Sequence, residues 1–424
     1  MSQRPTNQEI DRWVRDAVLG ADEATRNKAR ATIWARAIEA GAWSASIHDL
    51  YMAMGRGEVS GFTVPAINVR GLTYDFARAV FRAARAREVG AFIFEIARSE
   101  IGYTFQRPAE FSAAVLAGAM REGWTGPVFL QGDHFQFSAK KHADDPAAET
   151  KAVADLTREA IEGGFRNIDI DSSTLVDLSF ATVEEQQRVN GERGAEMTAV
   201  IRACEPKGVT VSVGGEIGEV GKKNSTVEEL TAYMGEYQKA LSRRGVGLVG
   251  ISKVSVQTGT SHGGIPLPDG SVAEVKLDFD TLARLSKLAR EKWGMSGAVQ
   301  HGASTLPAEL FHKFPEVGTA EIHLATEFQN MMYDGGAYPS DLKKRVYDYL
   351  RTACADERKA TDSDEQFFYK TRKKGFGPFK ADLCNLPQAT RDAILAPIEK
   401  KIAYLFEQLK VVGTARVVEK HVRR

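Results

Sequence analysis

A chain of 424 residues is long enough for one large domain with extensions, or for two to three domains. Lysine plus arginine and aspartate plus glutamate both number 56, so the formal net charge is zero and gives no general attraction for nucleic acid or an anionic membrane. No apolar run approaches the roughly 18 residues of a membrane-spanning helix. Residues 1–9 are polar and lack the apolar core of a signal peptide.

We therefore expect neither a nucleic-acid partner nor a membrane partner. Three scattered cysteines, Cys204, Cys354 and Cys384, do not form the even, regularly spaced set of a disulfide framework. Such a pattern is typical of a reducing compartment, and it predicts a cytoplasmic protein.

Residues 1–46 are predicted to form a helical N-terminal extension. Apolar side chains recur at helical spacing over residues 11–18 and 24–40. This extension is expected to cap the following domain or to form a partner surface.

Residues 47–330 change to short apolar runs that alternate with longer amphipathic stretches. The predicted strands are residues 62–69, 91–96, 128–131, 167–170, 209–213, 252–257, 297–300 and 320–324. The helical stretches between them include residues 76–88, 109–121, 150–162, 226–243 and 280–292. Continuous apolar strands that alternate with helices indicate a parallel sheet buried on both faces.

Eight such units predict an α/β fold, a (β/α)₈ TIM barrel, with active-site residues at the carboxyl ends of its strands. The alternative is a doubly wound open sheet, but no G-x-G-x-x-G follows the first predicted strand. Residues 331–424 are predicted as a helical and highly charged C-terminal extension. Its helices, over residues 342–359 and 387–410, flank the basic stretch 367–380.

Four of the eight histidines stand at or just past a predicted strand end: His134, His262, His301 and His323. Because all strands of a parallel barrel point the same way, these imidazoles are expected to meet at one rim. Three imidazoles with an open coordination position suit catalytic zinc, which polarises a carbonyl or activates water. Taken singly, each histidine would be interpreted as an ordinary core or surface residue.

Carboxylates occur at the same rim. Asp133 precedes His134, while Asp171 and Glu216 follow the fourth and fifth predicted strands. A carboxylate beside a metal can bind it, orient a ligand or transfer a proton. Glu95 lies inside the second predicted strand and is interpreted as a buried carboxylate paired with Arg98 or another base.

Glycines cluster after the later strands, at residues 214–215 and 263–264 and at Gly302. A glycine lets the backbone approach a ligand, and its N–H groups can cradle phosphate. Gly263, Ser304 and Thr326 lie in the late loops where barrels commonly hold a phosphate. Ordinary turns remain the alternative interpretation of these glycines.

Taken together, the motifs resemble the class II (zinc-dependent) ketose-bisphosphate aldolases, of fructose-bisphosphate or tagatose-bisphosphate type. The resemblance runs from about residue 60 to 330. Its motifs are PAINV at 65–69, QGDH at 131–134, DIDSS at 169–173, SVGGEIG at 212–218, TSHG at 260–263, HGAS at 301–304 and LATE at 324–327.

The resemblance implies a role for each matching residue. The zinc ligands would be His134, His262 and His301, with Co²⁺ or Fe²⁺ as possible replacements for Zn²⁺. Asp133 would transfer the proton of the C4 hydroxyl, while the metal holds the C2 carbonyl. Asp171 and Glu216 would support these ligands or bind the metal themselves. The residues expected at the substrate and its phosphate are Asn68, Gly263, Gly302, Ser304, His323 and Thr326.

The sequence departs from the family pattern at two places. The family usually has asparagine where His323 stands, so this histidine is expected to donate a hydrogen bond, hold phosphate or bind metal. The loop after the fifth strand usually carries an acidic residue, and here it reads GKKN at 221–224. Glu219 is the nearest candidate for the second catalytic proton-transfer group. The basic stretch 370–380 is expected to offer cations to a distal phosphate across a subunit boundary. The alternative is an exposed basic loop with no role in the site.

The leading hypothesis is reversible cleavage of a ketose 1,6-bisphosphate to glycerone phosphate and an aldehyde. The resemblance also implies a homodimer or homotetramer in cytoplasmic carbohydrate metabolism, such as glycolysis. Two alternatives stay open: a metal-dependent epimerase of a ketose or its phosphate, and a barrel subunit that supports a catalytic partner. A nucleic-acid role has only the basic stretch 370–380 in its favour.

Overall fold

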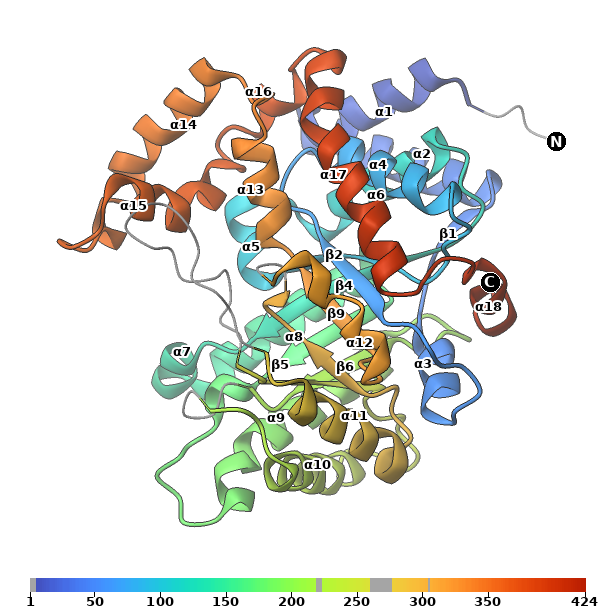
Figure 1. Ribbon diagram of the computed structural model, residues 1–424, viewed down its shortest axis with the longest axis vertical. Coiled ribbons are helices and arrows are strands. Elements are labelled where there is room, and N and C mark those ends of the chain that lie inside the picture. The colour runs from blue at the N-terminus through green and yellow to red at the C-terminus, as the bar shows by residue number, and fades with distance from the viewer. Residues whose placement is uncertain (1–4, 219–222, 260–276, 304–305) are drawn as a thin grey trace.

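The computed structural model describes residues 5–218, 223–259, 277–303 and 306–424 (Figure 1). Glu219, His262, Gly263 and Ser304, which were predicted to serve the site, lie outside these residues. Within the described ranges, no helix is both long enough and apolar enough to span a membrane.

Eight parallel strands close into a barrel, in the order β4-β3-β2-β9-β8-β7-β6-β5, and β5 pairs again with β4. The strands are β2 (Val64–Asn68), β3 (Ile93–Ala97), β4 (Gly126–Gln136), β5 (Asn167–Asp171), β6 (Ser212–Glu216), β7 (Lys253–Val256), β8 (Ala298–Gln300) and β9 (Glu321–Leu324). The closed sheet confirms the predicted (β/α)₈ barrel and excludes the alternative of a doubly wound open sheet. All eight predicted strands form, although β6 starts three residues later than the predicted 209–213.

Helices between and after the strands surround the barrel (Figure 1). They are α4 (Thr73–Arg85), α5 (Arg98–Thr104), α6 (Pro108–Arg121), α7 (Ala139–Asp144), α8 (Pro146–Glu162), α9 (Val183–Cys204), α10 (Val227–Ser242), α11 (Phe279–Trp293), α12 (Lys313–Glu316) and α13 (Thr326–Asp334). The residues at a helix N-terminus help to determine where that helix begins. In α10, Thr226 and Glu229 form a capping box that satisfies the first free N–H groups.

The N-terminal extension contains α1 (Asn7–Leu19) and α2 (Glu23–Glu39), which pack against α6, and then a strand. This strand, β1 (Ala42–Ala45), pairs in parallel with the start of β4 and is followed by α3 (His48–Gly55). The prediction of an entirely helical extension was therefore wrong at its end. A strand of four residues is too short to show alternation, and its stability comes from pairing with β4 rather than from its own sequence.

The C-terminal extension consists of α14 (Ser340–Ala353), α15 (Asp364–Thr371), α16 (Lys380–Cys384), α17 (Gln388–Gln408) and α18 (Ala415–His421). This extension packs against the barrel: α17 contacts α4, and Glu399 forms an ion pair with Arg82 at 2.6 Å. Beyond α17, the Leu409 carbonyl accepts a hydrogen bond of 3.0 Å from the N–H of Thr63, just before β2. The segment after α17 therefore helps to fix the start of the first barrel strand.

Asn167 is a fully buried amide that joins β1 to the barrel. Its Oδ1 accepts from the Ile47 N–H at 2.9 Å, and its Nδ2 donates to the carbonyls of Ala45 and Leu130 at 3.2 and 3.0 Å.

Asn167→Ala should lower the free energy of unfolding by about 1–3 kcal/mol, because three buried backbone groups lose their partner. Denaturant unfolding measures this. The exposed Asn27→Ala is the control and should change stability by less than about 0.5 kcal/mol; equal effects of the two variants would contradict this role.

Candidate metal centre and active site

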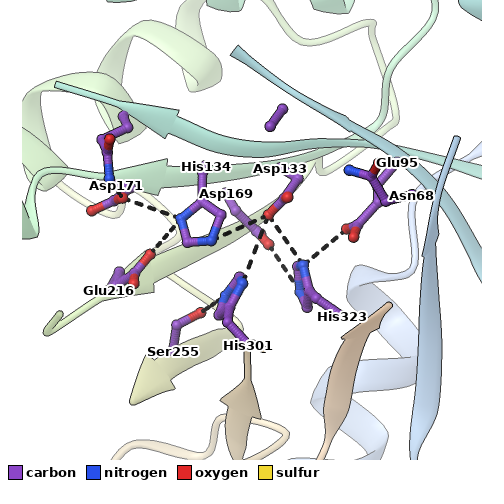
Figure 2. Close-up of polar contacts among 12 residues, drawn as sticks. Asn68, Glu95, Asp133, His134, Asp169, Asp171, Glu216, Ser255, His301 and His323 are labelled. Atoms are coloured by element: carbon purple, nitrogen blue, oxygen red, sulfur yellow. Dashed lines mark hydrogen bonds and ion pairs between the residues drawn. The ribbon is translucent and has the colours of Figure 1, made fainter. Parts of the chain in front are cut away.

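The carboxyl ends of the barrel strands open into a cavity of about 680 Å³. Three of the four histidines that follow predicted strands line it, namely His134, His301 and His323, together with Asp133. Figure 2 shows these side chains pointing toward one another from β4 and from the ends of β8 and β9. The fourth, His262, is outside the described residues. Strand closure thus brings together residues that are far apart in sequence.

A β-bulge sets the direction of the Asp133–His134 pair. The pairing of β4 with β5 shifts register between Gly132 and Phe135, so β4 carries one extra residue there. His134 lies within this bulge and adopts a left-handed backbone conformation, with φ +39°. Such a conformation is costly for a residue with a Cβ and occurs mostly at functional sites, where it aims a side chain.

His134 lies between two carboxylates. Its Nδ1 is 3.1 Å from Asp171 Oδ2 and 2.9 Å from Glu216 Oε2. The His301 ring lies next to it, with ring centroids 4.0 Å apart. His134, Glu216 and His301 each offer a ligand atom within 4.8 Å of the others, which is a spacing that one metal ion can bridge.

The charges around His134 fit a bound cation. Burial alone would lower the pKa of His134, but Glu216 and Asp133 outweigh it and the pKa rises well above its usual value. Burial, together with the nearby Asp171, raises the pKa of Glu216 to about 7. Nitrogen and carboxylate thus hold a proton between them in a buried site. A divalent cation supplies the same positive charge to both ligands at once.

Asp133 is buried and lies among three imidazoles. Its Oδ1 is 3.1 Å from His323 Nδ1, 3.8 Å from His134 Nε2 and 4.0 Å from His301 Nδ1. Ligand atoms of Asp133, His301 and His323 also lie within 4.8 Å of one another, so this set shares His301 with the set around His134. A third set, Glu95, Glu321 and His323, lies deeper and shares only His323 with the first two. A carboxylate in the position of Asp133 can exchange a proton with a group bound at such a metal.

His323 belongs to a second set of carboxylates on the side away from His134. Its Nδ1 is 3.0 Å from Glu95 Oε2, and its Nε2 is 2.7 Å from Glu321 Oε1. Burial would lower the pKa of His323, but Glu95 and Asp133 raise it well above its usual value. Glu95 is the buried carboxylate that was predicted, and the base beside it is His323 and not Arg98, which pairs with Glu149 at 2.5 Å. Arg98 lies at the exposed rim, whereas Glu95 points into the barrel.

Beneath His323 lies a charged layer that the sequence analysis missed. Lys253 Nζ is fully enclosed and contacts Asp169 Oδ2 at 2.9 Å, Glu321 Oε1 at 2.5 Å and Gln131 Oε1 at 2.8 Å. The Tyr51 hydroxyl donates a hydrogen bond to Glu321. The available signal was a lysine and a glutamate inside short buried strands, where a charge persists only if it is paired.

The remaining predicted site residues lie close by. Thr326 begins α13 and lines the cavity, as does Gly302, whose φ of +73° favours glycine. Asn68 ends β2, is buried, and donates to Glu100 Oε2 at 2.5 Å. Glu100 in turn accepts from Arg70 at 2.8 Å, and Arg70 is a wall of the cavity.

The basic stretch of the C-terminal extension reaches this cavity within the same chain. Lys373, in a 3₁₀ turn (Arg372–Gly375), lines it with Arg70, Arg98 and Lys141. Its ammonium lies 5.9 Å from the centre of the Tyr103 ring. Burial and the neighbouring Arg70 lower the pKa of Lys373, and no ion pair joins this lysine to any residue that the structure describes.

Comparison with known proteins agrees with this geometry. The family model described as fructose-bisphosphate aldolase class-II matches residues 52–375, most of the chain. The protein belongs to this family. A protein from Coccidioides immitis (strain RS), named provisionally as a fructose-bisphosphate aldolase, is 26% identical over 270 residues, which cover 63% of this chain and 76% of that protein.

Solved structures share the fold at low identity. A Sinorhizobium meliloti 1021 protein, named provisionally as a tagatose 6 phosphate kinase, superposes with a TM-score of 0.59 at 15% identity and covers 83% of this chain and 100% of its own. Campylobacter jejuni fructose-bisphosphate aldolase gives 0.52 at 18%, covering 88% and 97%. The fructuronate-tagaturonate epimerase of Cohnella laeviribosi gives 0.51 at 13%, covering 86% and 82%.

The buried Glu95 carboxyl should make stability depend on pH. Burial, followed by the charge of Asp133, raises its pKa to about 8 in the folded state. The folded protein therefore holds a proton that the unfolded chain loses near pH 4.5, so this contribution to stability is complete below that pH and is lost as pH rises toward 8. In chelator-treated protein, Glu95→Gln should reduce the fall in Tm between pH 5 and 8. The exposed Glu228→Gln should keep the wild-type slope, and an unchanged slope in Glu95→Gln would contradict the assignment.

Proposed function

We propose that this protein is a metal-dependent aldolase that reversibly cleaves a ketose 1,6-bisphosphate, of fructose or tagatose type, to glycerone phosphate and an aldehyde. One observation carries the proposal: Asp133, a buried carboxylate, stands directly beside a set of metal-ligand side chains at the rim of the barrel. An aldol cleavage needs this combination, because it requires a polarised carbonyl and a base for a hydroxyl proton on the same substrate.

The metal would be held by His134, His301 and Glu216, with Asp171 orienting His134 through its 3.1 Å contact. His262 remains a predicted further ligand. When bound, a divalent cation polarises a substrate carbonyl as a Lewis acid. Imidazole and carboxylate ligands suit Zn²⁺, and Co²⁺ or Fe²⁺ can use the same donors.

Asp133 would move the proton. In cleavage its carboxylate would accept the proton of the C4 hydroxyl while the C3–C4 bond breaks and the C2 carbonyl takes up the electron pair of that bond. In condensation Asp133 would return the proton to the aldehyde oxygen. His323, 3.1 Å from Asp133, is held by Glu95 and Glu321 and would donate a hydrogen bond to a substrate oxygen. Glu219 remains the predicted second proton-transfer group.

The rim of the cavity supports an anionic substrate. Arg98, Lys141 and Lys373 line it together with Gly302 and Thr326, which were expected near a phosphate. Positive side chains around a partly enclosed cavity raise the local concentration of a phosphorylated sugar and orient it.

A second candidate is a metal-dependent epimerase of a ketose or its phosphate. The observation in its favour is His323 in place of the asparagine that the family usually has. With Asp133, it gives the site two proton-transfer groups, enough for retro-aldol cleavage followed by re-addition. The epimerase of C. laeviribosi shares the fold. Product analysis separates the two, because only an aldolase releases a triose that a coupled dehydrogenase detects.

Removal of a metal ligand should remove metal and activity together. We expect His134→Ala and His301→Ala to lose most of the bound cation and all measurable cleavage in a screen of four or five ketose phosphates, with and without chelator. Elemental analysis and a triose-coupled assay measure these two losses. His421→Ala, on α18 away from the site, is the matched control, and full metal occupancy in both ligand variants would refute the ligand set.

Asp133→Asn should separate proton transfer from metal binding. The substitution keeps size and hydrogen bonding but removes the base, so kcat should fall about 100-fold or more with metal content unchanged. Steady-state kinetics and elemental analysis check both values. Asp177→Asn in an exposed loop should behave as wild type, and an unchanged kcat in Asp133→Asn would assign proton transfer to another group.

A further inference from the structure

A second cavity, of about 460 Å³, lies between the two extensions and is not used by the proposed reaction. Its walls come from α1, the start of α4, α6, and the region of α16 and α17. Figure 1 shows α1, α4, α6 and the start of α17 together on one side of the molecule. The volume is within the range of small-molecule sites, about 300–1,000 Å³.

The lining combines apolar and cationic side chains. Val14, Val18, Leu383 and Leu386 form part of the apolar wall. The charged side chains that line the cavity are five cations (Arg12, Arg15, Arg70, Lys380 and Arg391) and three carboxylates (Asp11, Asp75 and Glu110), a surplus of two positive charges.

Each of the three carboxylates already has a cationic partner. Asp75 pairs with Arg391 at 3.0 Å and Glu110 with Lys380 at 2.6 Å. Asp11 faces Arg121, at 3.5 Å, and accepts a hydrogen bond from the Tyr74 hydroxyl. The lining therefore has no spare anion for the arginines of α1.

Those arginines, Arg12 and Arg15, are exposed and form no hydrogen bond or ion pair with any residue that the structure describes. They are three residues apart on one helix, so both guanidinium groups can reach a single ligand. A guanidinium binds a carboxylate, sulfonate or phosphate group through paired hydrogen bonds. The neighbouring apolar wall would bury the body of the same molecule.

We propose that this cavity binds a small organic anion with an apolar body, with its charged group at Arg12 and Arg15 and its body against Val14, Val18 and Leu383. This site is separate from the barrel cavity, and its binding of a ligand does not depend on the proposed aldolase activity.

The two cavities have one lining residue in common, Arg70, through which ligand binding would be coupled to the barrel cavity. Arg70 lines both cavities and pairs with Glu100 at 2.8 Å. Phe376 lines the second cavity and follows the turn that carries Lys373 into the first. Phe376 packs so closely on Gly71 that a Cβ there would lie 2.5 Å from its ring. A ligand that fixes Phe376 and Arg70 fixes cationic side chains of the substrate cavity.

The test uses 8-anilinonaphthalene-1-sulfonate, which combines an apolar body with one anionic group. Titration of the full chain should give saturable fluorescence with one site per chain. Leu383→Trp fills the apolar wall and should abolish binding, whereas Arg12→Gln with Arg15→Gln should weaken it about tenfold with the fold intact. The exposed Arg416→Gln is the matched control. Binding that is absent, or that is unchanged in both cavity variants, overturns the proposal.

A second measurement keeps this inference distinct from the reaction. His134→Ala should bind the probe like wild type, because the metal centre is in the other cavity; loss of probe binding there would place the probe at the barrel rim and overturn the assignment. In wild type, the probe should change KM for the ketose phosphate by about threefold, and Leu383→Trp should not respond. Probe binding without a change in KM would refute the coupling.

Discussion

Buried negative charge is the constraint on which this site depends. Six carboxylates gather within the mouth and upper interior of the barrel: Glu95, Asp133, Asp169, Asp171, Glu216 and Glu321. Lys253 pairs with two of them, and the imidazoles of His134, His301 and His323 lie within 4 Å of the rest. Taking such charges out of water costs several kcal/mol each unless they are compensated. The compensation comes from protons on Glu95 and Glu216, whose pKa values are raised, and on His134 and His323, or from a cation that replaces those protons.

This constraint divides the barrel interior into two parts. Around Lys253 the compensation is built into the fold, because its buried ammonium is bonded to Asp169, Glu321 and Gln131. Around His134 it is exchangeable, because the ligands face the cavity and a proton or metal ion can enter. The lower layer contacts His323, and the upper layer holds the side chains that we propose take part in the reaction. A rigid support beneath an open coordination set is what a preorganised catalytic site requires.

Much of this arrangement was predictable, since it follows from periodicity and from chain direction. Alternating apolar strands and amphipathic helices gave the barrel, and histidines after parallel strands predicted one shared rim. The partners of those histidines were not predictable. The pairing of Glu95 with His323 instead of Arg98 depends on which face of a short strand points inward, and a slip of one residue reverses that choice. The bulge at His134 and the strand β1 depend on pairing with distant segments, which local sequence does not encode.

The extensions change how the barrel is expected to work. The C-terminal one delivers Lys373 to the substrate cavity within the same chain, and both extensions enclose a second cavity against α4 and α6. The claim that underlies the whole account is still the metal centre. Anomalous diffraction at the zinc edge, from crystals of protein purified without chelator, tests it most directly. The account predicts one strong peak about 2.0–2.2 Å from a ring nitrogen of His134, a ring nitrogen of His301 and a carboxylate oxygen of Glu216. No peak, or a peak that is not bound by His134 and His301, would contradict it.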